Sequence, residues 1–289
     1  MKKDENIKLC VGVLTYCPPG NPERLEVLKK CVTSMAALKR SQKDIRIHVW
    51  DNNSCKEARL FLESNSFIDS FYFSDGNYYD YGAMHFLAEK AKRIGAEYVM
   101  HVEDDNFFYD DDFLDDSFQF LSDNTDVGTL RLLKYDFDNK HLYDKFDAKQ
   151  RAKGNANAQR HFNQITREPL EWSKPYFVGK KVFYKNNWHW YNFPSLCKTA
   201  LLEEILPKKD HRPLIEFEGY LMKEYHRIAT ANNLKTAVLN LGAAEHLDIK
   251  TSMRIKQDKE PESNTRSVNP VIWKQLNIEI KKHLNEENQ

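Results

Sequence analysis

Three consecutive carboxylates, Glu103, Asp104 and Asp105, directly follow a short apolar run from Tyr98 to Val102. Like charges this close repel one another, so the triplet needs a cation or a set of hydrogen-bond donors to offset it. Carboxylate oxygens suit hard divalent ions such as Mg²⁺ and Mn²⁺, whose coordination shells are often completed by substrate phosphates. The triplet is equally compatible with a solvated acidic loop that caps the next helix, so on its own it leaves both interpretations open.

Other polar side chains follow further apolar runs of strand length. Thr15 and Tyr16 end the first run, and Asp51-Asn52-Asn53-Ser54 ends the second. Asn77 to Gly82 precedes a helical pattern, and His246 follows the last strand-like run. A lone histidine is more often a structural residue, but its place after a strand makes His246 a candidate metal ligand.

The segments that carry these residues alternate between strand and helix patterns. Strands are predicted at 8–16, 45–49, 71–73, 98–102, 127–133 and 236–241, and helices at about 22–38, 83–94, 112–121, 196–206, 218–232 and 271–284. This alternation predicts a mostly parallel sheet with a ligand site beyond the carboxyl ends of its strands, where the polar clusters lie. Gly82 would leave the start of helix 83–94 open to a phosphate.

Charge and cysteine content exclude some function classes. The 289-residue chain has 43 basic and 43 acidic side chains, so its net charge gives no reason to expect nucleic acid as a partner. The five cysteines are odd in number and show no metal-ligand spacing, which indicates reduced thiols. The polar N-terminus lacks a secretory signal, and no stretch approaches the ~20 apolar residues of a membrane span. A cytoplasmic protein is expected.

The length is compatible with one elaborated α/β domain. We expect this domain to occupy residues 1–255, with an acceptor-side insertion at about 136–195, where the strand and helix pattern loosens. Residues 256–289 read as a polar loop followed by an amphipathic C-terminal helix. That helix could make a peripheral contact with the inner face of an anionic membrane, although packing against the domain is favoured.

The motifs described above, in their order along the chain, resemble those of the GT-A glycosyltransferases, and especially of the inverting family 2 enzymes that use nucleotide sugars. Glu103-Asp104-Asp105 is similar to the D-x-D element of these enzymes, and Asp51-Asn52-Asn53-Ser54 is similar to their Asp-Asn-x-Ser segment beside the nucleobase. The resemblance spans about residues 8–248. It implies a GT-A (Rossmann-like) fold of the α/β class, a three-layer sandwich with a mostly parallel central sheet.

The resemblance also implies roles for individual residues. The nucleotide-sugar-binding residues would be Thr15, Tyr16, Asp51, Asn53, Asn77, Gly82, Glu103 and Asp104. A divalent metal, Mn²⁺ or Mg²⁺, would be bound by Asp105 and His246. Glu103 stands where the family usually has an aspartate, and its longer side chain suits a ribose contact better than a metal contact.

The later half of the chain resembles the acceptor side of the family. Trp190, Tyr191 and Asn192 resemble the floor of an acceptor site, and Glu216 and Glu218 fall where the family carries its catalytic acid. The sequence Glu-Phe-Glu-Gly replaces the common Glu-Asp pair, so either glutamate could be the catalytic base. Glu218 is favoured because it lies nearer a helix start, where the helix dipole stabilises an ionised carboxylate.

These features predict a metal-dependent glycosyltransferase that moves a sugar from a nucleotide diphosphate sugar to a hydroxyl of a glycan or glycolipid, in polysaccharide biosynthesis. A UDP-sugar donor and inversion are favoured, and retention stays open. A sugar nucleotidyltransferase is disfavoured, since residues 15–22 contain one glycine and no basic residue where that class needs a basic Gly-rich loop. A catalytically inactive carbohydrate- or nucleotide-binding protein of the same fold is the other alternative, and donor hydrolysis or transfer would distinguish it.

Overall fold

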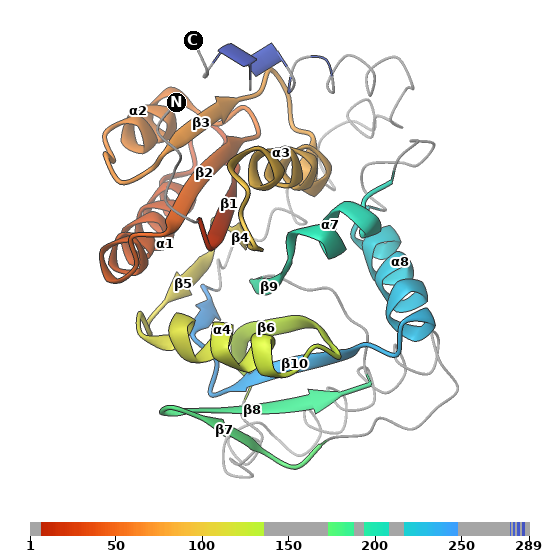
Figure 1. The fold of residues 1–289 in the computed structure, drawn as a ribbon. Coiled ribbons are helices and arrows are strands. Elements are labelled where there is room, and N and C mark those ends of the chain that lie inside the picture. The colour runs from red at the N-terminus through yellow and green to blue at the C-terminus, as the bar shows by residue number, and fades with distance from the viewer. Residues whose placement is uncertain are drawn as a thin grey trace, which may run out of the picture.

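The computed structural model describes residues 7–135, 173–187, 194–207 and 217–247, together with residues 278, 280, 282, 283, 285 and 286. A mixed sheet runs through the molecule in the strand order β3-β2-β1-β4-β9-β6-β10-β8-β7 (Figure 1). The strands are β1 (Leu9–Thr15), β2 (Ile45–Asp51), β3 (Ser70–Phe73), β4 (Tyr98–Glu103), β5 (Asn106–Phe108), β6 (Val127–Tyr135), β7 (Tyr176–Val178), β8 (Lys181–Asn186), β9 (Ser195–Lys198), β10 (Lys235–Asn240) and β11 (Ala244–His246).

The first half of the sheet is parallel, as the alternation of strands and helices predicts. β1 lies between β2 and β4, and Val11 pairs with Ile47 on one side and Met100 on the other. β3 extends this parallel part beyond β2. The polar residues after β1, β2 and β4 therefore meet at one edge of the sheet.

The second half of the sheet departs from the sequence-based expectation. Residues 196–206 were predicted to be one helix, but β9 occupies Ser195–Lys198 and the helix α7 (Thr199–Ile205) begins only afterwards. β9 is antiparallel to both β4 and β6, and its Ser195, Leu196 and Cys197 are buried between them. A four-residue segment such as Ser-Leu-Cys-Lys does not distinguish a strand from a helix, and pairing with two neighbours decides in favour of the strand.

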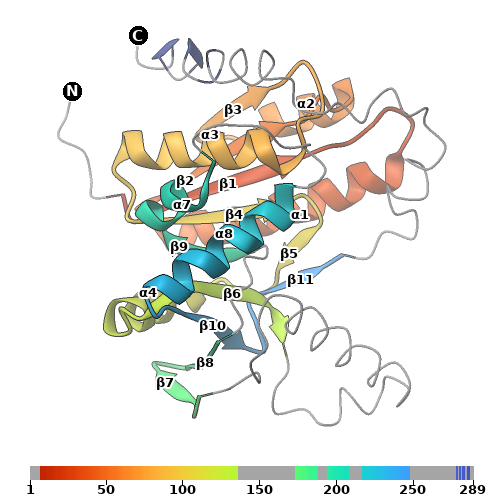
Figure 2. The ribbon, with the colours of Figure 1, turned by 90° about the vertical axis from the view of Figure 1, so that its right-hand side faces the viewer.

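Helices cover both faces of the sheet and form a three-layer α/β arrangement. The helices are α1 (Pro22–Ser41), α2 (Lys56–Glu63), α3 (Tyr79–Ile94), α4 (Phe113–Asp123), α7 and α8 (Phe217–Ala231). Leu9, Val11 and Val13 face the cluster that includes α1, α2 and α4. Cys10 faces the cluster that includes α3, α7 and α8, the helices on the side turned to the viewer in Figure 2. The predicted fold class is confirmed.

Helix α3 begins earlier than the sequence indicates, and this changes the interpretation of Gly82. The helix starts at Tyr79 with Tyr78 as its N-cap, so Gly82 lies within the first turn and not before it. A Cβ atom on Gly82 would lie 2.3 Å from Cζ2 of the buried Trp50. The glycine is therefore required for the close approach of α3 to β2, and the expectation that the helix begins only after Gly82 was wrong.

Besides β9, the sequence did not lead us to expect α2, the β7–β8 hairpin or the β5–β11 pair. The hairpin adds β8 antiparallel to β10, with β7 antiparallel to β8. Near the C-terminus, Ile280 is buried in the cluster of α3, and the ring of His283 lies 5.1 Å from that of Tyr72. In the described part of the chain, no helix is both long enough and apolar enough to cross a membrane.

Candidate functional site

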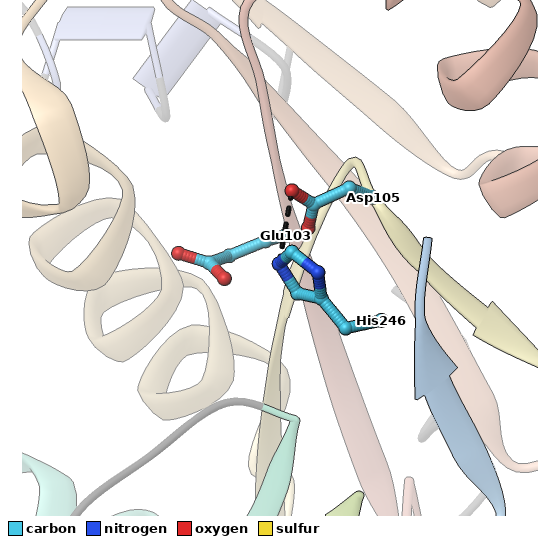
Figure 3. Close-up of side chains that lie close together, drawn as sticks. All are labelled: Glu103, Asp105 and His246. Atoms are coloured by element: carbon cyan, nitrogen blue, oxygen red, sulfur yellow. Dashed lines mark ion pairs between the residues drawn. The ribbon is translucent and has the colours of Figure 1, made fainter. Parts of the chain in front are cut away.

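Glu103, Asp105 and His246 come together beyond the carboxyl end of β4 (Figure 3). One potential ligand atom from each of them lies within 4.8 Å of the others. His246 Nε2 is 3.1 Å from Asp105 Oδ2. Asp105 is largely buried and His246 is exposed, so the group combines a sheltered carboxylate with an imidazole that solvent can reach.

Backbone pairing explains why residues so far apart in sequence meet. β11 is antiparallel to β5, which begins directly after the acidic triplet, and His246 is opposite Asn106. The Leu247 N–H donates to the carbonyl of Asp105 (2.7 Å), and the Glu103 N–H donates to Asn106 Oδ1 (3.0 Å). These bonds fix both ends of the acidic turn relative to His246.

Asp104, the middle residue of the triplet, points into the protein and is almost fully buried. Its Oδ2 accepts a hydrogen bond from the Tyr16 N–H (2.8 Å), and its Oδ1 pairs with the guanidinium of Arg24. Burial raises the pKa of Asp104 to about 7, and the positive charge of Arg24 opposes this shift. The sequence predicted a nucleotide contact for Asp104, whereas the structure commits both oxygens to protein donors.

Asp51, at the end of β2, is fully buried and also has several donors. Thr15 Oγ1 donates to its Oδ1 (3.0 Å), and the Ser54 N–H and Arg59 Nε both donate to its Oδ2 (3.0 Å each). Arg59 continues to the Asn53 side chain, where its Nη2 lies 3.1 Å from Oδ1. The predicted residues Thr15, Asp51 and Asn53 thus belong to one network, which Arg59 holds together.

The loop before α3 joins this network through Asn52. Its Oδ1 accepts hydrogen bonds from Trp50 Nε1 (2.8 Å) and the Tyr78 N–H (3.1 Å). Asn77 Oδ1 accepts from the Tyr79 N–H (2.9 Å), so the side chain of Asn77 stabilises the start of α3. Sequence reasoning did not single out Arg24 or Arg59, because a charged residue on a helix normally indicates a solvated surface. Asn52 was quoted within the Asp51-Asn52-Asn53-Ser54 motif, but it was given no role of its own.

Several predicted site residues cannot be compared with this geometry. Trp190, Tyr191, Asn192 and Glu216 lie outside the described residues, as does most of the expected insertion at 136–195. Glu218 is the second residue of α8, and its side chain is also outside the described part. The roles proposed for these residues as acceptor floor and catalytic base stay predictions.

The side chains of the cluster fit a divalent cation. Two carboxylates and one imidazole supply oxygen and nitrogen ligands of the kinds that Mn²⁺ accepts. The turn is negatively charged, and the interior position of Asp104 leaves Glu103 and Asp105 as the carboxylates nearest His246. The structure thus brings together the side-chain donors of a candidate site for a divalent metal ion.

Comparison with known proteins identifies the fold. The sequence matches no protein-family model and no curated protein. The structure is similar to S. aureus TarS 1–349, with 14% sequence identity and a TM-score of 0.50, over 83% of this chain and 60% of that chain. The full TarS structure gives 13% identity and a TM-score of 0.50, over 83% of this chain and 37% of that chain. A structure of TarS 1–349 with UDP-GlcNAc has a TM-score of 0.49 at 15% identity, over 85% and 60% of the two chains.

The chain thus has the GT-A glycosyltransferase fold that TarS has, as the resemblance of its motifs implied. It spans about 60% of the length of TarS 1–349. At this level of identity the likeness concerns the fold.

Proposed function

We propose that the protein is a metal-dependent glycosyltransferase that transfers a sugar from a nucleotide diphosphate sugar to a hydroxyl of a glycan or glycolipid. One observation carries this proposal: Glu103, Asp105 and His246 converge at the carboxyl edge of the parallel strands in a GT-A fold. In open α/β sheets this edge is where ligands bind. Asp105 and His246 supply ligands that a cation would need at that place, and the bound cation would in turn attract a diphosphate.

Asp105 and His246 would hold the cation, Mn²⁺ or Mg²⁺, and Glu103 would contact the ribose. When bound, the cation would offset the charge of the departing diphosphate. The network of Thr15, Asp51 and Asn53 would form the nucleobase side of the site, since it lies at the ends of the adjacent strands β1 and β2. A UDP-sugar is the favoured donor, an expectation that comes from the family resemblance.

The acceptor side is proposed from the sequence. Glu218 would take the proton of the acceptor hydroxyl while that oxygen attacks the anomeric carbon, with Glu216 as the other candidate base. Trp190, Tyr191 and Asn192 would line the acceptor site, and residues 136–195 would form an insertion beside it. We further propose that transfer proceeds with inversion and serves polysaccharide synthesis. The protein would act in the cytoplasm, with a peripheral contact to the membrane.

Thermal unfolding with a panel of nucleoside diphosphates and UDP-GlcNAc, each with and without Mn²⁺, tests the site. A ligand that binds only the folded state raises its apparent stability. We expect one diphosphate to stabilise the wild type in the presence of Mn²⁺, and Asp105→Ala to abolish this response. Asp115→Ala is the matched control, because it removes an exposed aspartate from the first turn of α4 and should leave the response unchanged.

Donor hydrolysis is then measured with the diphosphate sugar of the preferred base. Turnover that depends on Asp105 supports a transferase, whereas binding without turnover supports an inactive nucleotide-binding protein of this fold. If none of the diphosphates stabilises the wild type at saturating concentrations, the proposed function is wrong.

A further inference from the structure

Arg24 connects the first turn of α1 to the acidic turn after β4. Its guanidinium pairs with Asp104 Oδ1, and its Nη1 lies 3.5 Å from Asp105 Oδ2. Its Nε also donates to the carbonyl of Tyr16 (3.2 Å). Only 13% of the Arg24 side chain is exposed, so a single positive charge serves two carboxylates in a sheltered position.

The start of α1 fixes Arg24 in this place. Asn21 is the N-cap, and its side chain accepts a hydrogen bond from the Arg24 N–H (3.1 Å). Pro22 occupies the first turn, where its ring restricts the backbone to helical angles. The helix cap thereby holds the backbone of Arg24 independently of its side-chain contacts, and this lowers the entropic cost of the ion pairs.

These contacts divide the acidic triplet into two functional parts. Asp104 uses one oxygen for Arg24 and the other for the Tyr16 N–H. Arg24 and His246 meet at Asp105 Oδ2, which lies 3.5 Å from Arg24 Nη1 and 3.1 Å from His246 Nε2. The positive charge of the Arg24 guanidinium would repel a divalent cation that binds Asp105.

We propose that Arg24 is a permanent positive charge beside the acidic turn. Its guanidinium keeps Asp104 out of metal coordination and competes with a divalent cation for Asp105. This inference rests on the proposed metal site and adds a positioning residue to it. Without Arg24 the carboxylates would repel one another and the turn would lose stability, but the same loss of positive charge would strengthen metal binding.

The opposite signs of these two effects distinguish the proposal from a merely structural role. A residue that only supports the turn would lower stability and metal affinity together when it is removed. Removal of a competing cation lowers stability without metal and raises metal affinity. Coulomb's law for a guanidinium and a divalent ion roughly 6 Å apart in a water-like dielectric gives a change of about tenfold in affinity, equivalent to about 1.4 kcal/mol. Because only 13% of the Arg24 side chain is exposed, the effective dielectric is lower than that of water, and this change is a lower limit.

The test uses Arg24→Met, which removes the charge, and Arg24→Lys, which keeps it. Binding of Mn²⁺ alone is followed through the loss of the electron paramagnetic resonance signal of the free ion, and stability is followed by thermal unfolding in EDTA. We expect Arg24→Met to unfold at a lower temperature in EDTA and to bind Mn²⁺ about tenfold more tightly. Arg24→Lys should stay within about threefold of the wild type, since most of the electrostatic competition remains.

Lys29→Met is the matched control, because Lys29 lies one turn further along α1 and pairs with Glu26 at the surface. It should leave the affinity for Mn²⁺ unchanged. If Arg24→Met does not fold, Arg24→Met combined with Asp104→Asn removes both charges of the buried pair. Loss of the Asp104 carboxylate also weakens the attraction for a cation, so the double variant is compared with Asp104→Asn alone, against which it should bind Mn²⁺ about tenfold more tightly.

An affinity for Mn²⁺ that is unchanged or weakened in folded Arg24→Met would overturn the proposal while leaving the metal site intact. Failure of the proposed function looks different: neither the wild type nor Arg24→Met would bind Mn²⁺, and Asp105→Ala would behave as both do.

Discussion

Gly82→Ala is expected to destabilise the protein, although alanine is the better helix former. The added Cβ would lie 2.3 Å from Trp50 Cζ2 and 2.7 Å from Trp50 Cε2, distances at which atoms must move. Trp50 cannot yield easily, because it is buried, stacks on Tyr72 with ring centroids 4.4 Å apart, and donates to Asn52. The helix or the ring must shift by about an ångström to restore ordinary van der Waals contact.

Two effects set the magnitude. Replacing glycine with alanine in a helix contributes up to about 1 kcal/mol of stability, whereas overpacking a buried site costs about 1–3 kcal/mol and occasionally more. The contact in question lies far below the closest normal approach, so we expect the upper part of this range and a net loss of about 2 kcal/mol. For a chain of this size the midpoint of thermal unfolding should fall by roughly 4–8 °C.

The assay is urea unfolding followed by circular dichroism, with Gly219→Ala as the matched control. Gly219 also lies in the first turn of a helix, α8, and within the described residues a Cβ there would meet nothing within 4 Å. This variant should therefore gain up to about 1 kcal/mol. A Gly82→Ala protein as stable as the wild type would refute the packing argument, because it would mean that Trp50 can move without loss.

Further predictions concern buried ionisable groups. Burial lowers the pKa of Lys90 to about 8, so the cost of burying its charge is fully present below that pH and disappears as pH rises towards 10.5. In denaturant unfolding, Lys90→Met should raise the free energy of unfolding by on the order of 1 kcal/mol at pH 7 and leave it unchanged near pH 10.5. Burial lowers the pKa of His101 to about 3, so the unfolded state binds the extra proton and stability falls as pH drops from 6.5 to about 3; His101→Gln should reduce the slope of unfolding free energy against pH by about 1.4 kcal/mol per unit. Asp51→Asn removes an acceptor from the Ser54 N–H or from Arg59 and should cost about 2–3 kcal/mol by urea titration.

The parallel half of the fold could be predicted because its strands are buried on both faces. Val11, Ile47 and Met100 lie in adjacent strands, and each belongs to an apolar run that ends in polar residues. That pattern indicates both the strand and the edge at which the site lies. The alternation of strand and helix patterns then predicts the order of the elements.

The elements that were predicted incorrectly depend on contacts distant in sequence. Ser195–Lys198 is a strand because it pairs with both β4 and β6 and lies between them. The types of its four residues do not indicate this pairing. Gly82 ordinarily indicates a helix boundary, but here the ring of Trp50 makes a glycine necessary inside α3. In both cases packing overrides local preference.

The same distinction applies to the site. The acidic triplet and His246 could be singled out because each follows a strand, but the sequence could not show that Asp104 turns inward. That orientation depends on Arg24 and Tyr16, which lie in an early loop and helix. A pattern of residue types therefore predicts where the charges gather, whereas the fold determines which of them remain available to a ligand.

The short β5–β11 ladder has a consequence for how the site is assembled during synthesis. The acidic turn emerges from the ribosome early, but its partner His246 follows β10 and is held opposite Asn106 only after β11 has docked. Domains generally begin to fold from the N-terminal side during synthesis, so the first strands can form a sheet while the cluster is still incomplete. The nascent chain consequently has an incomplete cluster until β11 has been synthesised, so the contact of Asp105 with His246 forms late in the assembly of the fold.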